Sequence, residues 1–383
     1  MITPILSDVK TNKSYYLTQD GIYRPKLELL RIIFNLVPLA KPILILNLII
    51  VLNTSIVYAA TEPTSTFDFE ESSRWTTGEK MPTPRTELLA DSIDEKIYVI
   101  GGVDYSKGGQ LAIVEIYDTK KNEWITSAEP LPQAIDHSAA VAYNGKIYVV
   151  GGYLEGKVPT DKLFIYDPKK DEWEEGKPLP SPRGALTAEF INGTLYAVGG
   201  LNSSEIPVNT NEAYVPETNT WTTKAPMPTA RQHLASAVTE GKLFVMGGRI
   251  LGDGVSSEDI DALLTNFNRN EMYDPETDTW IVKQPMLDKR SGFGATSADG
   301  QIYVFGGQGV GKSFDSVEKY NPATNKWTYE PSMPSERMGL EAVTVDNKIY
   351  TIGGQIATDS GLVALDVNEI LNLKNENVEN KNK

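Results

Sequence analysis

The chain has 383 residues and a net charge of −15, and its 40% hydrophobic and 23% charged residues are ordinary for a soluble globular protein. It contains no cysteine, which excludes disulfides, thiol nucleophiles and cysteine-ligated zinc, and its two histidines, His137 and His233, are too few for a histidine-rich metal site. The acidic balance opposes contact with nucleic-acid phosphates, so we expect no nucleic-acid partner.

The N-terminal part divides into a basic region, residues 1–41, and residues 42–60, whose apolar run PILILNLIIVLNTSIVY covers 42–58. A basic flank, an apolar segment and the small residues Ala59 and Ala60 are typical of a signal peptide. The alternative is an uncleaved transmembrane anchor, for which this run is short. With either alternative we expect the rest of the chain to lie outside the cytoplasm, secreted or membrane-anchored, with membrane contact only through residues 42–58 if they are retained.

A pattern of about 48 residues repeats between residues 61 and 371. Each copy holds a β-branched and aromatic run that ends in two glycines and follows a tight-turn pair such as Asn144-Gly145. Such pairs favour hairpin turns, so we expect a strand a before the turn and a strand b after it. The glycine pairs are Gly101 and Gly102, Gly151 and Gly152, Gly199 and Gly200, Gly247 and Gly248, Gly306 and Gly307, and Gly353 and Gly354.

A strand c that ends in Tyr and a strand d that starts at Trp seven residues later complete the copies. The tryptophans are Trp75, Trp124, Trp173, Trp221, Trp280 and Trp327. Trp75 precedes the first glycine pair, and after the last pair there is only a strand c, VALDVNEI, whose Tyr position falls near 365–367. We therefore expect the Trp75 strand to complete the last copy and to close a ring, which removes exposed sheet edges.

This order of glycine pair, Tyr and Trp resembles the kelch-repeat family. The resemblance implies an all-β fold, a six-bladed kelch-type β-propeller with four antiparallel strands per blade, here preceded by one hydrophobic helix. It also implies that the repeated Gly, Tyr and Trp residues are structural. The polar tail, residues 372–383, is expected to be disordered. The stretch 306–313, GGQGVGKS, matches a phosphate-binding loop in letters, but its glycines belong to the repeat and a strand is expected to follow.

The strand order places the d–a and b–c connections on one face of the propeller. Arginines at the start of strand a and residues that follow the glycine pairs converge on this rim, and long variable loops on a rigid frame often bind ligands. The candidate ligand-binding residues are Arg85, Arg183, Arg231, Arg249, Arg290, Arg337, Tyr153, Gln308 and Gln355. The alternative is that the arginines pair with neighbouring acidic residues or pack between blades. The longest b–c loop, 249–271, contains SSEDIDALLTNF, for which we expect a short helix.

These features favour an extracytoplasmic binding module whose ligand is an acidic protein segment or an anionic carbohydrate, because many kelch domains bind partners. The alternative is a carbohydrate-active enzyme, a sugar isomerase or lyase similar to a sialic-acid mutarotase, with a general base in the funnel. Candidates for that base are Glu87, His137, His233 and Glu341. A third alternative is a cell-envelope scaffold without a discrete ligand. We assign no catalytic residue, no metal ligand and no cofactor from the sequence.

Overall fold

The computed structural model describes residues 4–8, 13–17, 23–25, 74–105, 109–251, 264–358 and 361–373. The chain divides into two compact units, Met1–Phe69 and Glu70–Lys383. In the first unit, β1 (Pro4–Asp8), β2 (Lys13–Leu17) and β3 (Tyr23–Pro25) form an antiparallel sheet. The predicted signal peptide or anchor at 42–58 lies outside the described residues. Within the described part of the chain, no helix is long and apolar enough to cross a membrane.

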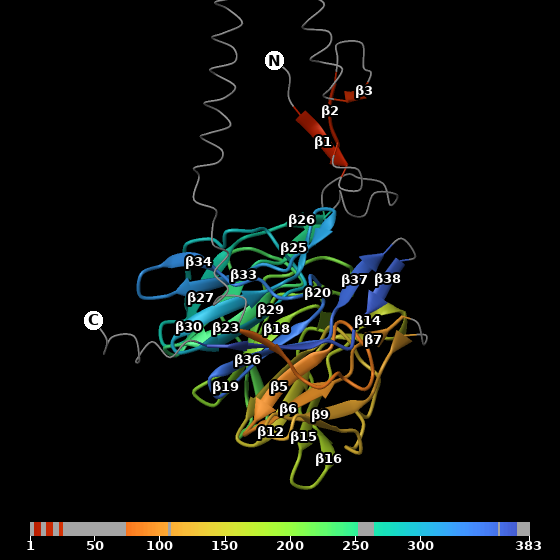
Figure 1. Ribbon diagram of the computed structural model, residues 1–383. Helices are drawn as coiled ribbons and strands as arrows, with labels where there is room; N and C mark the ends of the chain where they lie inside the picture. The colour runs from red at the N-terminus through yellow and green to blue at the C-terminus, as the bar shows by residue number, and fades with distance from the viewer. Residues whose placement is uncertain are drawn as a thin grey trace, which may run out of the picture. The chain divides into compact units, whose positions relative to one another are not determined.

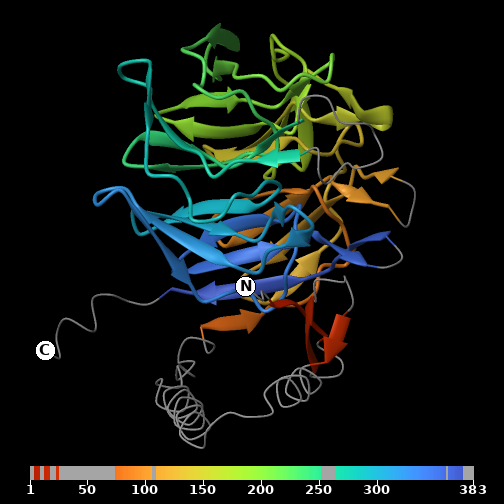
Figure 2. The ribbon, with the colours of Figure 1, turned by 90° about the horizontal axis from the view of Figure 1, so that it is seen from above.

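The second unit consists of six four-stranded antiparallel sheets, which are the blades of a propeller (Figures 1 and 2). Blade 1 has β5 (Leu89–Ile93), β6 (Lys96–Ile100), β9 (Val114–Asp118) and β10 (Glu123–Ile125). Blade 2 has β11 (Ala139–Tyr143), β12 (Lys146–Val150), β15 (Leu163–Asp167) and β16 (Glu172–Glu175). Blade 3 has β18 (Thr187–Ile191), β19 (Thr194–Val198), β21 (Asn211–Val215) and β22 (Thr220–Thr223).

The other blades follow the same order, from the innermost strand outward. Blade 4 has β23 (Ala235–Thr239), β24 (Lys242–Met246), β27 (Asn270–Asp274) and β28 (Thr279–Val282). Blade 5 has β29 (Gly294–Ala298), β30 (Gln301–Phe305), β33 (Val317–Asn321) and β34 (Lys326–Glu330). Blade 6 has β35 (Glu341–Val345), β36 (Lys348–Ile352), β39 (Asn368–Asn372) and β4 (Trp75–Thr77). Neighbouring innermost strands contact one another in a closed cycle that ends with β35 against β5, so the predicted six-bladed ring is confirmed.

Blade 6 is completed by the N-terminal strand, as predicted. Leu371 of β39 pairs with Trp75 of β4, and Trp75 Nε1 donates a hydrogen bond of 3.0 Å to the Pro331 carbonyl. Because Tyr pairs with Trp at this register in the other blades, the Tyr position of blade 6 is Leu371 and not 365–367 as expected. The propeller also extends past residue 371, since β39 reaches Asn372 and Leu373 is buried. Residues 374–383 of the predicted tail lie outside the described residues.

The blades stack through aromatic side chains. In blade 1, Tyr117 packs against Trp124 of the same blade with 5.1 Å between ring centres, and against Tyr350 of blade 6 with 5.9 Å. Trp124 Nε1 donates to the Glu79 carbonyl at 2.9 Å, which ties blade 1 to the segment that follows β4. Strand β6 is buried from Ile97 to Ile100 because neighbouring blades cover both of its faces. These aromatic residues therefore pack within and between blades.

The glycine pairs let the end of strand b pack closely against the segments that precede strand a in its own blade and in the next blade. Gly152 has a φ of 105°, and a Cβ there would lie 1.9 Å from Ser138 Oγ and 2.6 Å from the Asp136 carbonyl oxygen. Its N–H donates at 2.9 Å to the carbonyl of Arg183, in the next blade. Only glycine combines this backbone conformation with so little space.

In five of the six blades the b–c connection forms a short two-stranded ribbon in place of an irregular loop. The ribbon strands are β7 (Val103–Asp104), β8 (Gly109–Gln110), β13 (Tyr153–Leu154), β14 (Val158–Pro159), β17 (Arg183–Gly184), β20 (Leu201–Asn202), β25 (Arg249–Leu251), β26 (Leu264–Asn266), β31 (Gln308–Gly309), β32 (Lys312–Ser313), β37 (Gln355–Thr358) and β38 (Gly361–Ala364), with a 3₁₀ turn η1 (Glu155–Lys157) after β13. In blade 3, β20 pairs instead with β17, from the d–a connection. The ribbons labelled in Figure 1 lie on the same side of the unit, which confirms that the b–c connections share a face.

The b–c connections of blades 4 and 5 contain the predicted helix SSEDIDALLTNF and the stretch 306–313 that matches a phosphate-binding loop. Residues 264–266 of the expected helix SSEDIDALLTNF form strand β26, and Phe267 N–H donates to the Gly248 carbonyl at 2.8 Å. The predicted helix is therefore wrong for residues 264–266, because this segment pairs with β25. The rest of the predicted helix, residues 256–263, lies outside the described residues. In 306–313, β31 and β32 form a hairpin, so no helix N-terminus follows the glycines and the match to a phosphate-binding loop has no structural counterpart.

Candidate functional site

The five arginines expected at the start of strand a are fully buried inside the blades. Arg231 Nη1 lies 2.5 Å from Glu271 Oε2 and donates at 2.9 Å to the Thr229 carbonyl, while Nη2 donates at 3.0 Å to the Val245 carbonyl. Each arginine pairs with a strand-c glutamate of its own blade, the pairs being Arg85–Glu115, Arg183–Glu212, Arg231–Glu271, Arg290–Glu318 and Arg337–Glu369. Of the two alternatives for these residues, the structure favours ion pairing within the blade over contact with a ligand.

Blade 2 has neither charge. Its residue at the arginine position is Ile135, whose carbonyl accepts from Gly102 N–H as the arginine carbonyls accept from the other glycine pairs. The strand-c position is Phe164, and both side chains are buried in one hydrophobic cluster. An apolar pair thus replaces the ion pair in this blade.

Two residues after the arginine position, a ring of backbone hydrogen bonds closes around the propeller axis. Each ring residue donates its N–H to the carbonyl of the ring residue in the preceding blade, over 2.8–3.4 Å. All six residues have a left-handed backbone, with φ between 49° and 65°. The ring residues are Glu87, His137, Ala185, His233, Gly292 and Gly339.

This ring separates two cavities. On the side of the ribbons lies a funnel of about 740 Å³, whose floor includes Glu87, His137, His233 and Gly292. On the other side lies a channel of about 300 Å³, which is lined by the innermost strands. The five buried arginines line neither cavity.

Four of the candidate rim residues do line the funnel, namely Arg249, Tyr153, Gln308 and Gln355. Arg249 Nη1 donates at 2.6 Å to Gln308 Oε1, and Arg249 Nη2 lies 3.1 Å from His233 Nε2. Exposed apolar residues also line the funnel, namely Tyr105, Val158 and Leu362, which are 50%, 53% and 46% exposed, beside the exposed charged residues Lys157 and Glu205. The funnel therefore has a polar floor and a mixed wall on which three apolar residues are exposed.

Three of the four candidate bases meet at this floor. His137 Nε2 lies 3.4 Å from Glu87 Oε2, His137 Nδ1 lies 2.9 Å from Asp136 Oδ1, and the rings of His137 and His233 have 4.9 Å between their centres. One atom each of Glu87, His137 and His233 fall within 4.8 Å of one another, a spacing at which the three can hold a metal ion. The fourth candidate, Glu341, lines the channel below the ring.

The two histidines differ in charge preference. Burial lowers the pKa of His233 well below its usual value, and the charge of Arg249 lowers it further. Burial alone would also lower the pKa of His137, but the carboxylates of Glu87 and Asp136 together raise it above its usual value. His233 is therefore a neutral imidazole, whereas His137 holds a proton more readily.

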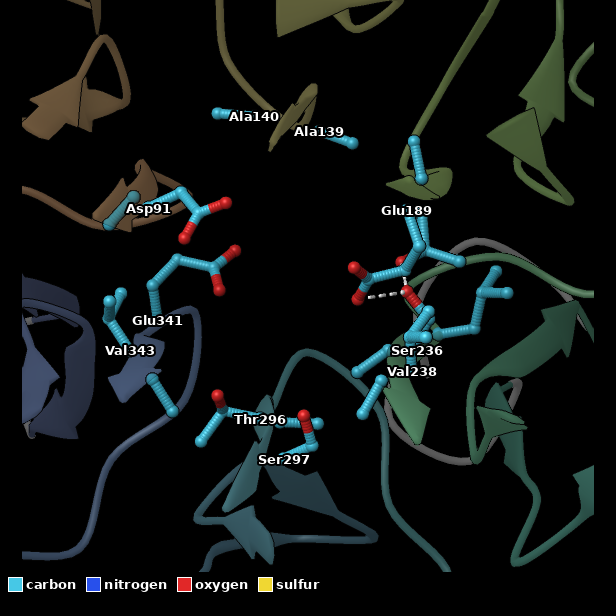
Figure 3. A pocket seen from close by; sticks show the side chains of 18 of the residues that line it. Asp91, Ala139, Ala140, Glu189, Ser236, Val238, Thr296, Ser297, Glu341 and Val343 are labelled. Carbon is cyan, nitrogen blue, oxygen red and sulfur yellow. Dashed lines mark hydrogen bonds between the residues drawn. The ribbon is translucent and has the colours of Figure 1, made fainter. Parts of the chain in front are cut away.

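The channel contains three carboxyl groups from three blades. Figure 3 shows Asp91 and Glu341 on one side and Glu189 on the opposite side, where Ser236 Oγ donates to Glu189 Oε1 at 3.1 Å. Burial raises the pKa of Asp91 to about 6, and burial together with neighbouring carboxylates raises the pKa of Glu189 and of Glu341 to about 8. These groups take up protons near neutral pH.

Sequence reasoning missed two features of this site. From the sequence we expect no metal ligand, because two histidines are too few, but Glu87 occupies the same repeat position as His137 and His233 and lies close enough to be a third donor. The glutamate partners of the buried arginines were also missed. A signal was present, because Glu stands two residues before the strand-c Tyr in four of the blades that have the arginine, and Phe164 stands there in the blade with Ile135.

The comparisons with known proteins agree with this architecture. A family model described as the KLHDC2/KLHL20/DRC7 Kelch-repeats domain matches residues 52–200, 126–286 and 185–379. These matches cover most of the chain, which therefore belongs to the kelch-repeat family.

Individual relatives match over shorter stretches. The chain is 33% identical over 111 residues to beta-scruin of Limulus polyphemus, 27% of this chain and 12% of that protein. It is 36% identical over 87 residues to Kelch-like protein 35 of Mus musculus, 23% of this chain and 15% of that protein. Less than a fifth of each relative is thus spanned. A solved structure titled "Structure of YjhT" superimposes with a TM-score of 0.64 at 14% identity, over 79% of this chain and 98% of that chain, which shows a common fold.

Proposed function

We propose that the propeller is a binding module for a protein partner, and that a segment of the partner with an acidic side chain enters the funnel. The observation that carries this proposal is the funnel itself, in which the exposed apolar residues Tyr105, Val158 and Leu362 line the same cavity as Arg249. Exposed apolar side chains gathered around a cavity are typical of protein interaction sites. An arginine on the floor favours a carboxylate. Membership of the kelch-repeat family supports a protein partner.

The test is selection from a peptide library on the purified propeller, with an anionic glycan array in parallel. We expect acidic peptides to be selected and their affinity to fall at least about tenfold in Tyr105→Ala and in Arg249→Gln, because loss of one central interface contact costs about 1.4 kcal/mol or more. Val282→Ala is the matched control, since Val282 is an exposed apolar residue of β28 outside the funnel. Selection of glycans only, or equal loss in the control, would contradict the proposal.

We also propose that the propeller lies outside the cytoplasm, since residues 42–58 are apolar and a basic region precedes them. A C-terminal reporter enzyme that is active only outside the cytoplasm tests this. We expect activity that is lost on deletion of 42–58, and an inactive reporter on the intact chain would argue against export.

A further inference from the structure

We propose that Glu87, His137 and His233 form a binding site for one divalent zinc-type metal ion at the floor of the funnel. Imidazole nitrogen and carboxylate oxygen are donors that zinc takes, and three protein donors with one open position are typical of zinc sites that remain accessible. The donors come from blades 1, 2 and 4, so only the closed ring brings them together.

The distances are close to those a metal needs. With metal–donor distances of about 2.0–2.1 Å, neighbouring donors of a tetrahedral zinc ion lie about 3.3–3.4 Å apart. His137 Nε2 and Glu87 Oε2 are already 3.4 Å apart, and all three donor atoms lie within 4.8 Å of one another. Small side-chain rotations are therefore enough to place the third donor.

Both imidazoles are oriented by the residue that precedes them. His137 Nδ1 is hydrogen-bonded to Asp136 Oδ1 at 2.9 Å, and His233 Nδ1 to Gln232 Oε1 at 3.0 Å. Asp136 and Gln232 are themselves buried. Metal-binding histidines commonly donate their second nitrogen in this way, which fixes the tautomer and leaves Nε2 for the metal.

The backbone supports the same conclusion. All six ring residues have a left-handed backbone, which suits glycine, and the ring has Gly292, Gly339 and the small Ala185 at the three positions outside the cluster. Large side chains in this conformation cost about 1–2 kcal/mol each. They occur in the ring only where the three donor side chains meet.

Arg249 is the cation in direct contact with this cluster, with Nη2 at 3.1 Å from His233 Nε2. A metal at Nε2 must displace that guanidinium, so metal binding and the Arg249–His233 contact exclude each other. Removal of Arg249 is therefore expected to strengthen metal binding, although it weakens binding of an acidic peptide. Because the two expected effects of removing Arg249 are opposite, failure of the metal site can be distinguished from failure of the proposed function.

The test is calorimetric titration of the full chain with Zn²⁺, without any partner. We expect one ion per chain, a Kd at least about tenfold weaker in His137→Ala, His233→Ala and Glu87→Gln, a comparable loss in Asp136→Asn, and a tighter Kd in Arg249→Gln. Folding is expected to persist, because alanine already occupies the equivalent ring position at Ala185 with a φ of 52°; circular dichroism checks this. Glu205→Gln is the control, a carboxylate on the funnel wall outside the cluster.

Three results would overturn the proposal. These are absence of Zn²⁺ binding by the intact chain, unchanged binding in folded His233→Ala and Glu87→Gln, and tighter binding of Ca²⁺ than of Zn²⁺. The last result would indicate a site built from oxygen donors elsewhere on this acidic protein.

Discussion

Ile135 and Phe164 in blade 2 occupy the places that Arg and Glu occupy in the other five blades. Charges buried this deeply lose their hydration, and the ion pair offsets that loss only while both partners are present. An apolar pair of suitable shape avoids the cost altogether. The chain therefore fills this buried position with an ion pair in five blades and with an apolar pair in blade 2.

Removing one charge of such a pair is expected to be severe. Arg231→Ala leaves Glu271 buried without its partner, so we expect the free energy of unfolding to fall by about 3–5 kcal/mol in chemical denaturation. The double change Arg231→Ile with Glu271→Phe copies blade 2 and is expected to recover most of that loss. A cost below about 1 kcal/mol in the single variant, or no recovery in the double, would show that the pair is not what stabilises this position.

At the scale of the element, the glycine pairs join one blade to the next. Gly145 and Gly151 have similar φ values of 73° and 64°, but a Cβ on Gly145 meets nothing within 4 Å, whereas one on Gly151 lies 2.7 Å from the Arg183 carbonyl oxygen of the next blade. The two positions therefore separate backbone strain from lack of space.

We expect Gly151→Ala to lower the free energy of unfolding by about 1–3 kcal/mol more than Gly145→Ala, because both share the left-handed backbone strain and only Gly151→Ala is overpacked. Thermal and chemical denaturation of the two variants measure this difference. Equal losses would mean that the conformation of the glycines, and not the close approach of the next blade, accounts for their repetition.

Local patterns predicted the strands well, and contacts between blades poorly. The turn pair Asn144-Gly145 and the run that follows it specify a hairpin without any other part of the chain. The pairing of β25 with β26 was missed because SSEDIDALLTNF favours a helix in isolation and tertiary pairing prevails over local propensity. The cluster of Glu87, His137 and His233 depends on a ring that joins residues about 50 or more positions apart, so no local signal marks it.

At the scale of the whole molecule, the channel gathers Asp91, Glu189 and Glu341 from blades 1, 3 and 6. The pKa values of these three carboxyl groups are raised in the folded state. At a pH between the ordinary pKa of such a group and its raised pKa, the folded protein therefore binds more protons than the unfolded chain. Stability from these groups is therefore present at low pH and is lost as the pH rises, for Glu189 from its ordinary value of 4.5 through about 8.

We expect Glu189→Gln to be more stable than the unchanged protein at about pH 9, by about 1–3 kcal/mol, since one pKa unit corresponds to about 1.4 kcal/mol and channel water reduces the effect. The difference should vanish near pH 4, where the carboxyl group is protonated in both states. Denaturation curves at the two pH values measure it, with Glu205→Gln as an exposed control. A variant that is less stable at the higher pH would contradict the raised pKa of Glu189.

The position of the closing strand β4 in the sequence also determines when blade 6 can assemble during synthesis. Arg74, at its start, donates a hydrogen bond to Asn372, 298 positions later. At about 5–20 residues per second, synthesis of the intervening chain takes about 15–60 s. During that interval β4 has no partner in its sheet, whereas blades 1 to 5 in turn receive all of their strands before blade 6 does. The last blade therefore assembles from the earliest and the latest parts of the propeller, and the central cavities are enclosed only when these two parts meet.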